Sequence, residues 1–332
     1  MGKDFPHQVF REYDIRGIAD DEITEDFAYT LAKAYTQMLP QDVAQPVVVA
    51  RDVRLTGLAL QQAVMRGLMA QGIDVIDLGM VPTPMAYYAV YHLGAAGCIM
   101  ITASHNPAAY NGFKLMLGQK SFFGTCLQHL KQIMLQAPAK PALKQGKHQH
   151  QDLSQVYKQF VLEDCPLAKP LKVVIDAGNG PAGLVAAPVY RGLGCEVIEL
   201  YCEPDGRFPN HHPDPTVEEN MRDIAAKVCE TGADLGIAFD GDGDRIGVVD
   251  EQGKIIWGDM LLLLFARELL QTYPGATVIS EAKSSQLLYD DVQARGGQAL
   301  MWRTGHSLMK AKMKETGALL AGEMSGHFFF AD

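Results

Sequence analysis

Short apolar runs that alternate with amphipathic stretches constrain the fold of this chain more than any other feature of its sequence. Runs with the length of buried strands lie at 46–50, 97–101, 171–176 and 234–239. Between the first two of these runs, Leu60, Val64 and Leu68 recur at helical spacing. Strands that alternate with helices are typical of parallel sheets covered by helices. The sequence therefore predicts an α/β protein with mixed or parallel sheets.

Length and composition set further bounds. A chain of 332 residues is long enough for two or three domains. The net charge of -10 disfavours nucleic acids and anionic membranes as partners. The N-terminus has no apolar signal-peptide core, and the six cysteines show no zinc-site spacing. We therefore expect a cytoplasmic protein with no nucleic-acid or membrane partner.

A polar cluster follows the strand predicted at 97–101. It reads Thr102-Ala103-Ser104-His105-Asn106-Pro107, and the proline cannot continue a strand ladder. The hydroxyl of Ser104 is then expected at the carboxyl end of a buried strand, where open α/β sheets bind ligands. Each of these polar residues also suits a simple turn, so the pattern alone leaves both interpretations open.

Three aspartates alternate with glycines after the strand predicted at 234–239. Asp240, Asp242 and Asp244 bring several negative charges into a small volume, which favours a bound Mg²⁺ or Ca²⁺. An EF-hand does not fit, because Arg245 stands where that loop requires glycine. An acidic hairpin turn is the alternative. Arg245 beside a cation suggests a phosphate ligand that both would hold.

Polar residues also follow three later predicted strands and are expected at one edge of a sheet, as a rim that binds a polyol. They are Lys283; then Arg303, Thr304, Gly305 and His306; and finally Glu323, Ser325 and His327. Near the start of the chain, Arg11 and Arg16 could each present a planar guanidinium to a phosphate.

A glycine-rich loop offers a rival function. Gly178, Gly180 and Gly183 match the dinucleotide-binding pattern, and Glu199 lies about where a ribose-binding acid belongs. An NAD-dependent oxidoreductase would use this loop to hold a pyrophosphate. Pro181 removes one backbone donor from the loop, so a tight turn between strand and helix is the simpler interpretation.

Domain boundaries are expected where large apolar residues are sparse. The segment from about 136 to 155 is rich in Gln, Lys, Pro and His, and a second break is expected near Gly253. The predicted domains are 1–150, 151–252 and 253–332.

The motifs together resemble the α-D-phosphohexomutase superfamily, and most closely its bacterial phosphomannomutase/phosphoglucomutase members. They occur in the family's order and span Phe10 to His327. They are F-R-x-Y-D-I-R-G, T-A-S-H-N-P, D-G-D-G-D-R, R-T-G-H-S and G-E-M-S-G-H. The resemblance implies α/β domains around a central cleft, which carry the phosphoserine, the metal and the sugar site in that order.

The resemblance also implies roles for individual residues. Ser104 would be the phosphoserine, and with Asp240, Asp242 and Asp244 it would hold one Mg²⁺. Arg245 would steady the transferring group, with Lys114, Arg16 and His105 as candidate proton carriers. The substrate would contact Tyr13, Lys283, Arg303, Thr304, Gly305, His306, Glu323, Ser325 and His327.

The implied reaction interconverts hexose 1-phosphate and hexose 6-phosphate, with mannose or glucose as the sugar. Phospho-Ser104 would give a hexose 1,6-bisphosphate, which turns in the cleft and returns its other phosphate to the serine. Added hexose 1,6-bisphosphate would act as an activator. We expect a monomer or a weak homodimer whose partner is a phosphosugar.

One departure from the family pattern concerns the C-terminus. Family members carry a fourth domain whose Arg/Ser/Thr loop grips the phosphate that is not transferred, whereas this sequence ends at Asp332. If the fourth domain is missing, we expect from the sequence an intact phosphorylation site, but weak substrate binding and little turnover. A non-catalytic phosphosugar-binding protein is the alternative.

Overall fold

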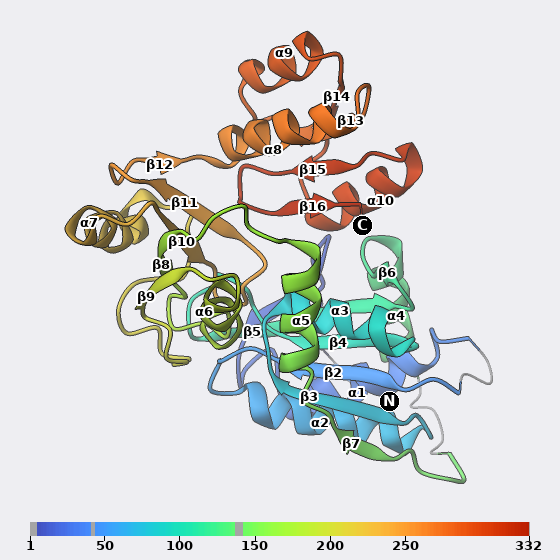
Figure 1. The fold of residues 1–332 in the computed structure, drawn as a ribbon. Coiled ribbons are helices and arrows are strands. Elements are labelled where there is room, and N and C mark those ends of the chain that lie inside the picture. Colours follow the sequence, from blue (N-terminus) through green and yellow to red (C-terminus); the bar gives the residue numbers. More distant parts are fainter. Residues whose placement is uncertain (1–4, 41–43, 137–141, 332) are drawn as a thin grey trace.

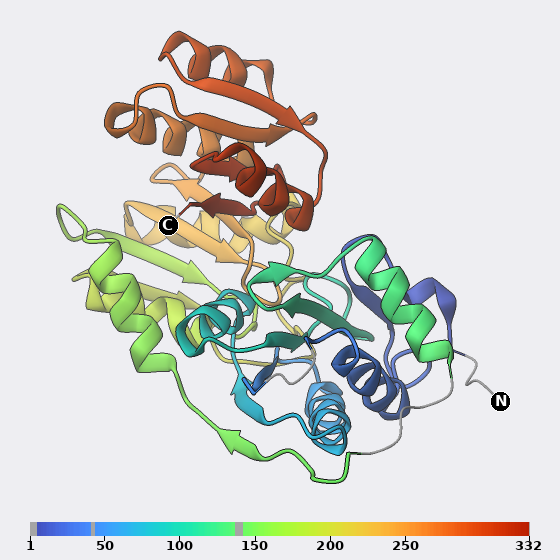
Figure 2. The same cartoon turned by 90° about the vertical axis from the view of Figure 1, so that its right-hand side faces the viewer.

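Three α/β units, each with its own sheet, make up the structure (Figure 1). The computed structural model describes residues 5–40, 44–136 and 142–331. Part of the predicted boundary segment, 137–141, lies outside the described residues. Figure 2 shows the third unit, in orange and red, at the opposite end of the molecule from the blue helices of the first. The predicted α/β class with mixed sheets is confirmed.

The first unit is a sheet covered by helices on both faces. Its strand order is β1-β5-β4-β2-β3-β7, and β6 pairs with β5. Val47 and Val49 of β2 pack in a core with α1, α2 and α4, whereas Val48 and Ala50 pack in a second core with α3. Because a central strand buried on both faces is continuously apolar, this strand was predictable. The elements are η1 (His7–Val9), β1 (Ile15–Ile18), α1 (Glu25–Thr36), β2 (Val47–Arg51), α2 (Gly57–Ala70), β3 (Val75–Met80), α3 (Thr83–Leu93), β4 (Gly97–Ile101), β5 (Tyr110–Leu117), β6 (Lys120–Ser121), α4 (Thr125–Leu135) and β7 (His148–His150).

The second unit has the strand order β12-β11-β10-β8-β9. Helix α7 packs on one face of this sheet and α6 on the other. Strand β12 pairs with β11, so we propose that the third unit begins after residue 256 and not at 253. The elements are α5 (Ser154–Asp164), β8 (Lys172–Asp176), α6 (Gly183–Gly192), β9 (Glu196–Leu200), η2 (Glu218–Met221), α7 (Arg222–Thr231), β10 (Leu235–Phe239), β11 (Ile246–Asp250) and β12 (Ile255–Ile256).

The third unit has the strand order β14-β13-β15-β16. Helices α8 and α9 pack on one face of its sheet, and α10 packs on the other. The elements are α8 (Gly258–Thr272), β13 (Thr277–Glu281), α9 (Gln286–Ala294), β14 (Gln298–Trp302), α10 (His306–Thr316), β15 (Leu320–Gly322) and β16 (Phe328–Phe330).

All three units share one strand arrangement. Three parallel strands, β3-β2-β4, β9-β8-β10 and β14-β13-β15, are each followed by an antiparallel strand, β5, β11 and β16 respectively. The last two strands of each set form a hairpin. The loops of the three hairpins span 102–109, 240–245 and 323–327. These loops carry the predicted serine, aspartate and sugar motifs, so the same position is used in every unit.

Candidate active site

The serine loop of the first unit meets the aspartate loop of the second. Ser104 is fully buried, and its Oγ donates a hydrogen bond of 2.7 Å to Oδ2 of Asp240. The two backbones are also in close contact, because a Cβ added to Gly241 would lie 2.4 Å from the carbonyl oxygen of Ser104. A side chain at position 241 would therefore push the two loops apart.

Ser104 sits in a strained backbone conformation. Its φ is +51°, a left-handed region that few residues other than glycine adopt. The hydroxyl of Thr102 accepts a hydrogen bond of 2.8 Å from the Ser104 backbone N–H. Nδ1 of His105 lies 3.3 Å from the Ser104 Oγ. Such strain persists only where neighbouring groups hold it, and it often accompanies function.

Arg54, which was not predicted to have a role, fixes the serine loop (residues 102–109) through hydrogen bonds to backbone carbonyls. Its guanidinium is buried and donates to four backbone carbonyls, and one of them is that of Ser104, at 2.8 Å. Asp52 neutralises this guanidinium from 3.2 Å, and the ring of Phe208 from the second unit covers it at 5.4 Å. The other three carbonyls are those of Asn106 at 2.5 Å, Pro107 at 2.7 Å and Tyr110 at 2.7 Å.

Arg16 also donates hydrogen bonds to the serine loop. Its Nη1 donates to the Asn106 side chain at 2.8 Å and to the carbonyl of Ala103 at 3.3 Å. Asp14 pairs with the guanidinium at 2.6 Å. Burial would lower the pKa of Arg16, but the charge and hydrogen bond of Asp14, together with the charges of Asp242 and Asp244, outweigh it, so the pKa is raised. Arg16 is therefore a fixed positive charge beside Ser104.

The three predicted aspartates form one cluster. A carboxylate oxygen from each of Asp240, Asp242 and Asp244 lies within 4.8 Å of the others. Oδ2 of Asp242 accepts hydrogen bonds from Thr83 and Lys114, each at 2.6 Å, whereas its Oδ1 is buried without a hydrogen-bond partner. A buried, unpaired carboxylate oxygen is costly unless a cation or a donor reaches it. The donor set, three carboxylates beside a serine hydroxyl, fits a hard divalent cation such as Mg²⁺.

The cluster is electrostatically unbalanced. Burial raises the pKa of Asp240 to about 7, and the charges of Asp242 and Asp244 add to this. Lys114 lies between Asp242 and Asp244, at 2.6 and 2.5 Å. Burial alone would lower its pKa, but the two aspartates raise it above its ordinary value. Lys114 thus pairs with two of the three carboxylates, and a bound cation would favour the ionised form of Asp240 as well.

Arg245 follows the cluster and has spare hydrogen-bonding capacity. Its Nε is buried without a hydrogen-bond partner and lies 3.8 Å from Oδ2 of Asp240. Since Oδ2 of Asp240 also contacts the Ser104 hydroxyl, this guanidinium lies beside the serine. An anion bound at Ser104 would satisfy the unpaired donor.

The predicted sugar loop of the third unit (residues 323–327) contacts the aspartate cluster. His327 Nε2 lies 3.1 Å from Oδ1 of Asp244, and His327 Nδ1 lies 2.9 Å from Glu323 and 3.0 Å from Ser325. Glu323 also accepts a hydrogen bond of 2.5 Å from the backbone N–H of Gly305. His327 therefore connects the sugar loop to the aspartate cluster, and Glu323 connects it to the loop before α10.

Glu281, for which the sequence analysis also gave no role, fixes the third-unit loops relative to each other. This buried carboxylate accepts from the backbone N–H of Met324 at 2.8 Å and from the hydroxyl of Thr304. Tyr13 of the first unit donates to the carbonyl of Thr304 at 2.8 Å. Its ring lies where a side chain at Gly305 would be. The predicted contacts Tyr13, Thr304 and Gly305 are thus brought together.

The remaining predicted contacts lie farther out. Lys283 is exposed, with its Nζ 3.5 Å from Glu281, and the exposed Arg303 stacks over Trp302 at 5.7 Å. His306 is packed between Tyr13 and His327, at ring distances of 6.2 and 5.6 Å. Lys283 and Arg303 are thus exposed, and the partners seen here, Glu281 and Trp302, lie outside the aspartate cluster.

Comparison with known proteins identifies the family. Three family models match successive parts of the chain, and they are described as α/β/α domains I, II and III of phosphoglucomutase/phosphomannomutase. They match residues 7–136, 153–253 and 257–332. The chain belongs to the phosphoglucomutase/phosphomannomutase family.

Individual relatives agree with this assignment. A phosphomannomutase/phosphoglucomutase of Pseudomonas putida is 47% identical over 98% of this chain and 70% of its own length. A phosphoglucomutase of Neisseria gonorrhoeae is 45% identical over the same shares. The solved structure of a family protein from Burkholderia thailandensis has a TM-score of 0.94 and 44% identity, and the match covers 99% of this chain and 73% of that one. The predicted resemblance to phosphohexomutases is confirmed.

The glycine-rich loop of this phosphohexomutase family member does not suit a dinucleotide. The backbone N–H groups of Gly178, Asn179 and Gly180 already donate to Asp176, Tyr201 and Ala177, respectively. A Cβ at Gly183 would lie 2.4 Å from the carbonyl of Cys202, so this glycine serves the close packing of α6. The loop has too few free donors to hold a pyrophosphate, and the oxidoreductase alternative is not favoured.

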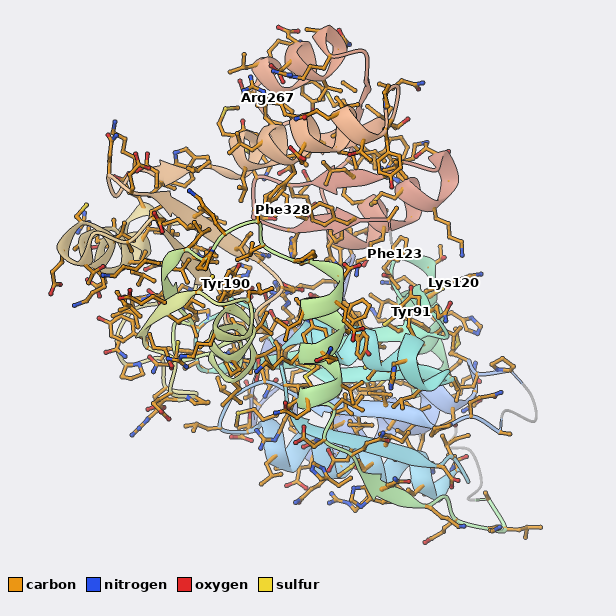
Figure 3. All side chains as sticks on the ribbon, viewed as in Figure 1. Tyr91, Lys120, Phe123, Tyr190, Arg267 and Phe328 are labelled. Atoms are coloured by element: carbon orange, nitrogen blue, oxygen red, sulfur yellow. The ribbon has the colours of Figure 1, made fainter. Side chains whose placement is uncertain are left out.

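The protein has a cavity of about 1110 Å³ between its first and third units. Figure 3 labels four of its lining residues, Tyr91, Lys120, Phe123 and Phe328. Lys310, one helical turn after His306, also lines it and lies 4.4 Å from the ring of Tyr87. Ser104 and the three aspartates are not among its lining residues, so the cavity is separate from the candidate active site.

Within the described residues, no helix has the length and apolar character needed to cross a bilayer.

Mg²⁺ is expected to stabilise the protein through the aspartate cluster. At about 100 times its Kd, an ion that binds only the folded state adds about 2.7 kcal/mol to the free energy of unfolding. Thermal unfolding with and without MgCl₂ measures this. Asp242→Asn should lose the increase, whereas Asp290→Asn, at an exposed helical position, should retain it. An equal increase in both variants would place the ion elsewhere.

Proposed function

We propose that this chain is a phosphohexomutase that reversibly interconverts hexose 1-phosphates and hexose 6-phosphates through phosphorylated Ser104. The observation that carries the proposal is the position of the Ser104 hydroxyl. It is buried, it contacts the aspartate cluster through Asp240, and it is flanked by the unpaired donor of Arg245 and by Arg16. Relatives that are 47% and 45% identical are named phosphomannomutase/phosphoglucomutase and phosphoglucomutase.

The positive groups around Ser104 suit phosphoryl transfer. A phosphoserine carries a charge of about -1.5 to -2, and catalysis of its transfer rests on positioning and charge neutralisation. Arg245 offers a free donor for the phosphoryl oxygens, and Arg16 and Lys114 add fixed positive charge. Asp240, Asp242, Asp244 and the phosphoserine would hold Mg²⁺, which neutralises negative charge on the phosphoryl group.

The proposed reaction has two transfers. In the first, the Ser104 Oγ–P bond breaks and the free hydroxyl of a hexose 1-phosphate forms the new O–P bond, while its proton passes to a neighbouring base. The product is a hexose 1,6-bisphosphate, which turns round and returns the phosphate at the other end to Ser104. Lys114, Arg16 and His105 are the candidates for moving the proton. Lys114 and Arg16 are held in their charged forms, whereas burial lowers the pKa of His105, whose Nδ1 lies 3.3 Å from the Ser104 Oγ, so His105 is the one that can accept it. A free hexose 1,6-bisphosphate would load Ser104 and act as activator.

Recognition of the sugar is assigned to the third unit. Glu323 and Ser325 would bind hydroxyls, with His327 beside them. The further substrate contacts would be Tyr13, Lys283, Arg303, Thr304, Gly305 and His306. Both oxygens of Glu323 already accept one hydrogen bond each. Since a carboxylate oxygen has two lone pairs, each can still accept from a sugar hydroxyl.

Phosphate transfer to the chain tests the proposal directly. Glucose 1,6-bisphosphate and the purified chain should yield one phosphate per chain by intact mass. Glucose 1-phosphate and mannose 1-phosphate, each with a trace of the bisphosphate, should then be converted to 6-phosphates. No phosphate on the chain and no 6-phosphate from either sugar would refute the proposal. Turnover would exclude a non-catalytic phosphosugar-binding protein.

A change in the sugar loop should affect substrate binding more than chemistry. Ser325→Ala removes one hydrogen-bonding group, worth about 0.5–1.5 kcal/mol. We expect KM to rise by about 2- to 10-fold with a smaller change in kcat, as measured by initial rates. Ser154→Ala, far from the site at the start of α5, should leave both constants unchanged. An unchanged KM in Ser325→Ala would remove Ser325 from the sugar contacts.

A further inference from the structure

Two histidines and one aspartate come together at the outer edge of the first sheet, away from the candidate active site. His148 and His150 lie on β7, and since they are two residues apart they project from the same face of this strand. Strand β7 pairs in parallel with β3, where Asp77 is the partner of His150. Oδ2 of Asp77 lies 3.4 Å from Nε2 of His148 and 3.8 Å from Nδ1 of His150.

The carboxylate of Asp77 is fixed so that one oxygen faces the histidines. Its Oδ1 accepts hydrogen bonds from the side chain of Gln61 at 2.6 Å and from the backbone N–H of Gly79 at 2.7 Å. These bonds leave Oδ2 for the two imidazoles. The aspartate side chain is only 16% exposed, whereas the histidines are 43% and 62% exposed. A rigid oxygen thus faces two nitrogens on side chains that are free to turn.

The contact from His148 to Asp77 is a long hydrogen bond of 3.4 Å, and that from His150 is too long for one, whereas both distances suit ligands around one metal ion. Hydrogen bonds from nitrogen to oxygen are mostly about 2.7–3.2 Å long, shorter than either distance here. Tetrahedral Zn²⁺ with ligands at about 2.0–2.2 Å separates neighbouring ligand atoms by about 3.4 Å. Among the described residues, only the aspartate cluster already has all its ligand atoms within 4.8 Å of one another. The two imidazoles must therefore turn toward each other, which their exposure allows.

We propose that Asp77, His148 and His150 bind a transition-metal cation such as Zn²⁺. Two imidazole nitrogens and one carboxylate oxygen are a ligand set that Zn²⁺, Cu²⁺ and Ni²⁺ favour, and water would fill the remaining position. Mg²⁺ prefers oxygen ligands, so it selects the aspartate cluster instead. The chain would then carry two cation sites of different chemistry on separate surfaces.

The position of the site gives it a structural consequence. Strand β7 has only three residues and lies in the segment that leads from the first unit to α5. A metal that joins Asp77 to both histidines fastens this strand to β3. The exposed Lys144 and Lys147 stand just before β7, so trypsin cleavage there reports on how firmly the segment is held.

Zinc binding and protection from trypsin are the two measurements. With millimolar Mg²⁺ present, wild-type protein should take up one Zn²⁺ per chain from a chromophoric chelator. Zn²⁺ should also slow cleavage after Lys144 and Lys147 at least about fivefold, with cleavage at other lysines as the internal reference. His148→Gln and His150→Gln, both at exposed positions, should lose the zinc and the protection.

Two further variants make the test specific. Asp77→Asn keeps an Oδ1 acceptor for Gln61 and Gly79 and replaces only the oxygen that faces the histidines, so it should also lose the zinc. His129→Gln removes an exposed histidine on α4 and should behave as wild type. Zinc uptake and protection that persist in the His148, His150 and Asp77 variants would overturn the proposal. So would absence of uptake by the wild-type protein.

Discussion

Ser104→Ala is expected to abolish phosphate incorporation and to reduce mutase turnover by about 10³-fold or more, because loss of a nucleophile removes the covalent step itself. The substitution deletes one hydroxyl and its hydrogen bond to Asp240. Alanine must adopt the same positive φ, so a small loss of stability is also expected. The free energy of unfolding should nevertheless change far less than the activity.

Intact mass after incubation with glucose 1,6-bisphosphate measures the first effect, and initial rates measure the second. Ser154→Ala, which lies outside the site, should incorporate one phosphate as wild type does. One phosphate on the Ser104→Ala chain would show that another residue is the carrier. Wild-type turnover by that variant would contradict the proposed mechanism.

Arg54→Met should have the largest effect among residues that do not touch the proposed substrate. Methionine keeps much of the volume but removes every donor to the four carbonyls of the serine loop. It also leaves the charge of Asp52 buried without its partner. Removing one member of a buried ion pair typically costs about 3–5 kcal/mol. Without this support the strained Ser104 should lose its position, so phosphorylation of the serine should slow sharply.

Two readouts separate positioning from general stability. Phosphate incorporation from glucose 1,6-bisphosphate, quenched at successive times, gives the rate of Ser104 phosphorylation. A second variant, Arg54→Ala, leaves space for a free guanidinium ion, so millimolar guanidinium should restore part of the phosphorylation rate in that variant. Urea at the same concentration should not. Arg66→Met removes an exposed arginine of α2 and should leave rate and stability near wild type. A variant that loses stability but phosphorylates at the wild-type rate would limit Arg54 to a structural role.

The sequence predicts the motifs themselves better than it predicts the residues and contacts that hold these motifs in position. Ser104, Asp242 and Glu323 were found because polar residues directly follow apolar strands, and strand ends of this kind meet at one edge of a sheet. The order of the motifs then pointed to the family. Nothing local shows that His327 of the third unit reaches Asp244 of the second, because this contact depends on how the units are placed.

Arg54 and Glu281 were missed for a different reason. In the sequence each is one charged residue at the end of a strand, where exposed charges are common. Only the fold shows that both are buried and that both bond to backbone groups of loops distant in sequence. The glycine pattern at 178, 180 and 183 shows the opposite error, because the sequence suggested a site where the structure has none. The backbone N–H groups of Gly178 and Gly180 donate to groups of the protein itself.

The three hairpin loops have one consequence for how the protein can change. In the proposed function, phosphoryl chemistry depends on the loops at 102–109 and 240–245, whereas the loop at 323–327, on the sheet of the third unit, contributes to sugar recognition. On the proposed function, we therefore expect that a short loop grafted at 323–327 from a relative with another sugar would alter substrate preference without rebuilding the sheet that carries the serine. His327 limits this freedom, because it bonds to Asp244 and must be kept in any graft. In the proposed function, recognition and reaction thus belong to loops on separate sheets, which are joined by His327, by the backbone hydrogen bond from Ile246 to Gly326 and by the contact of Tyr13 with Thr304.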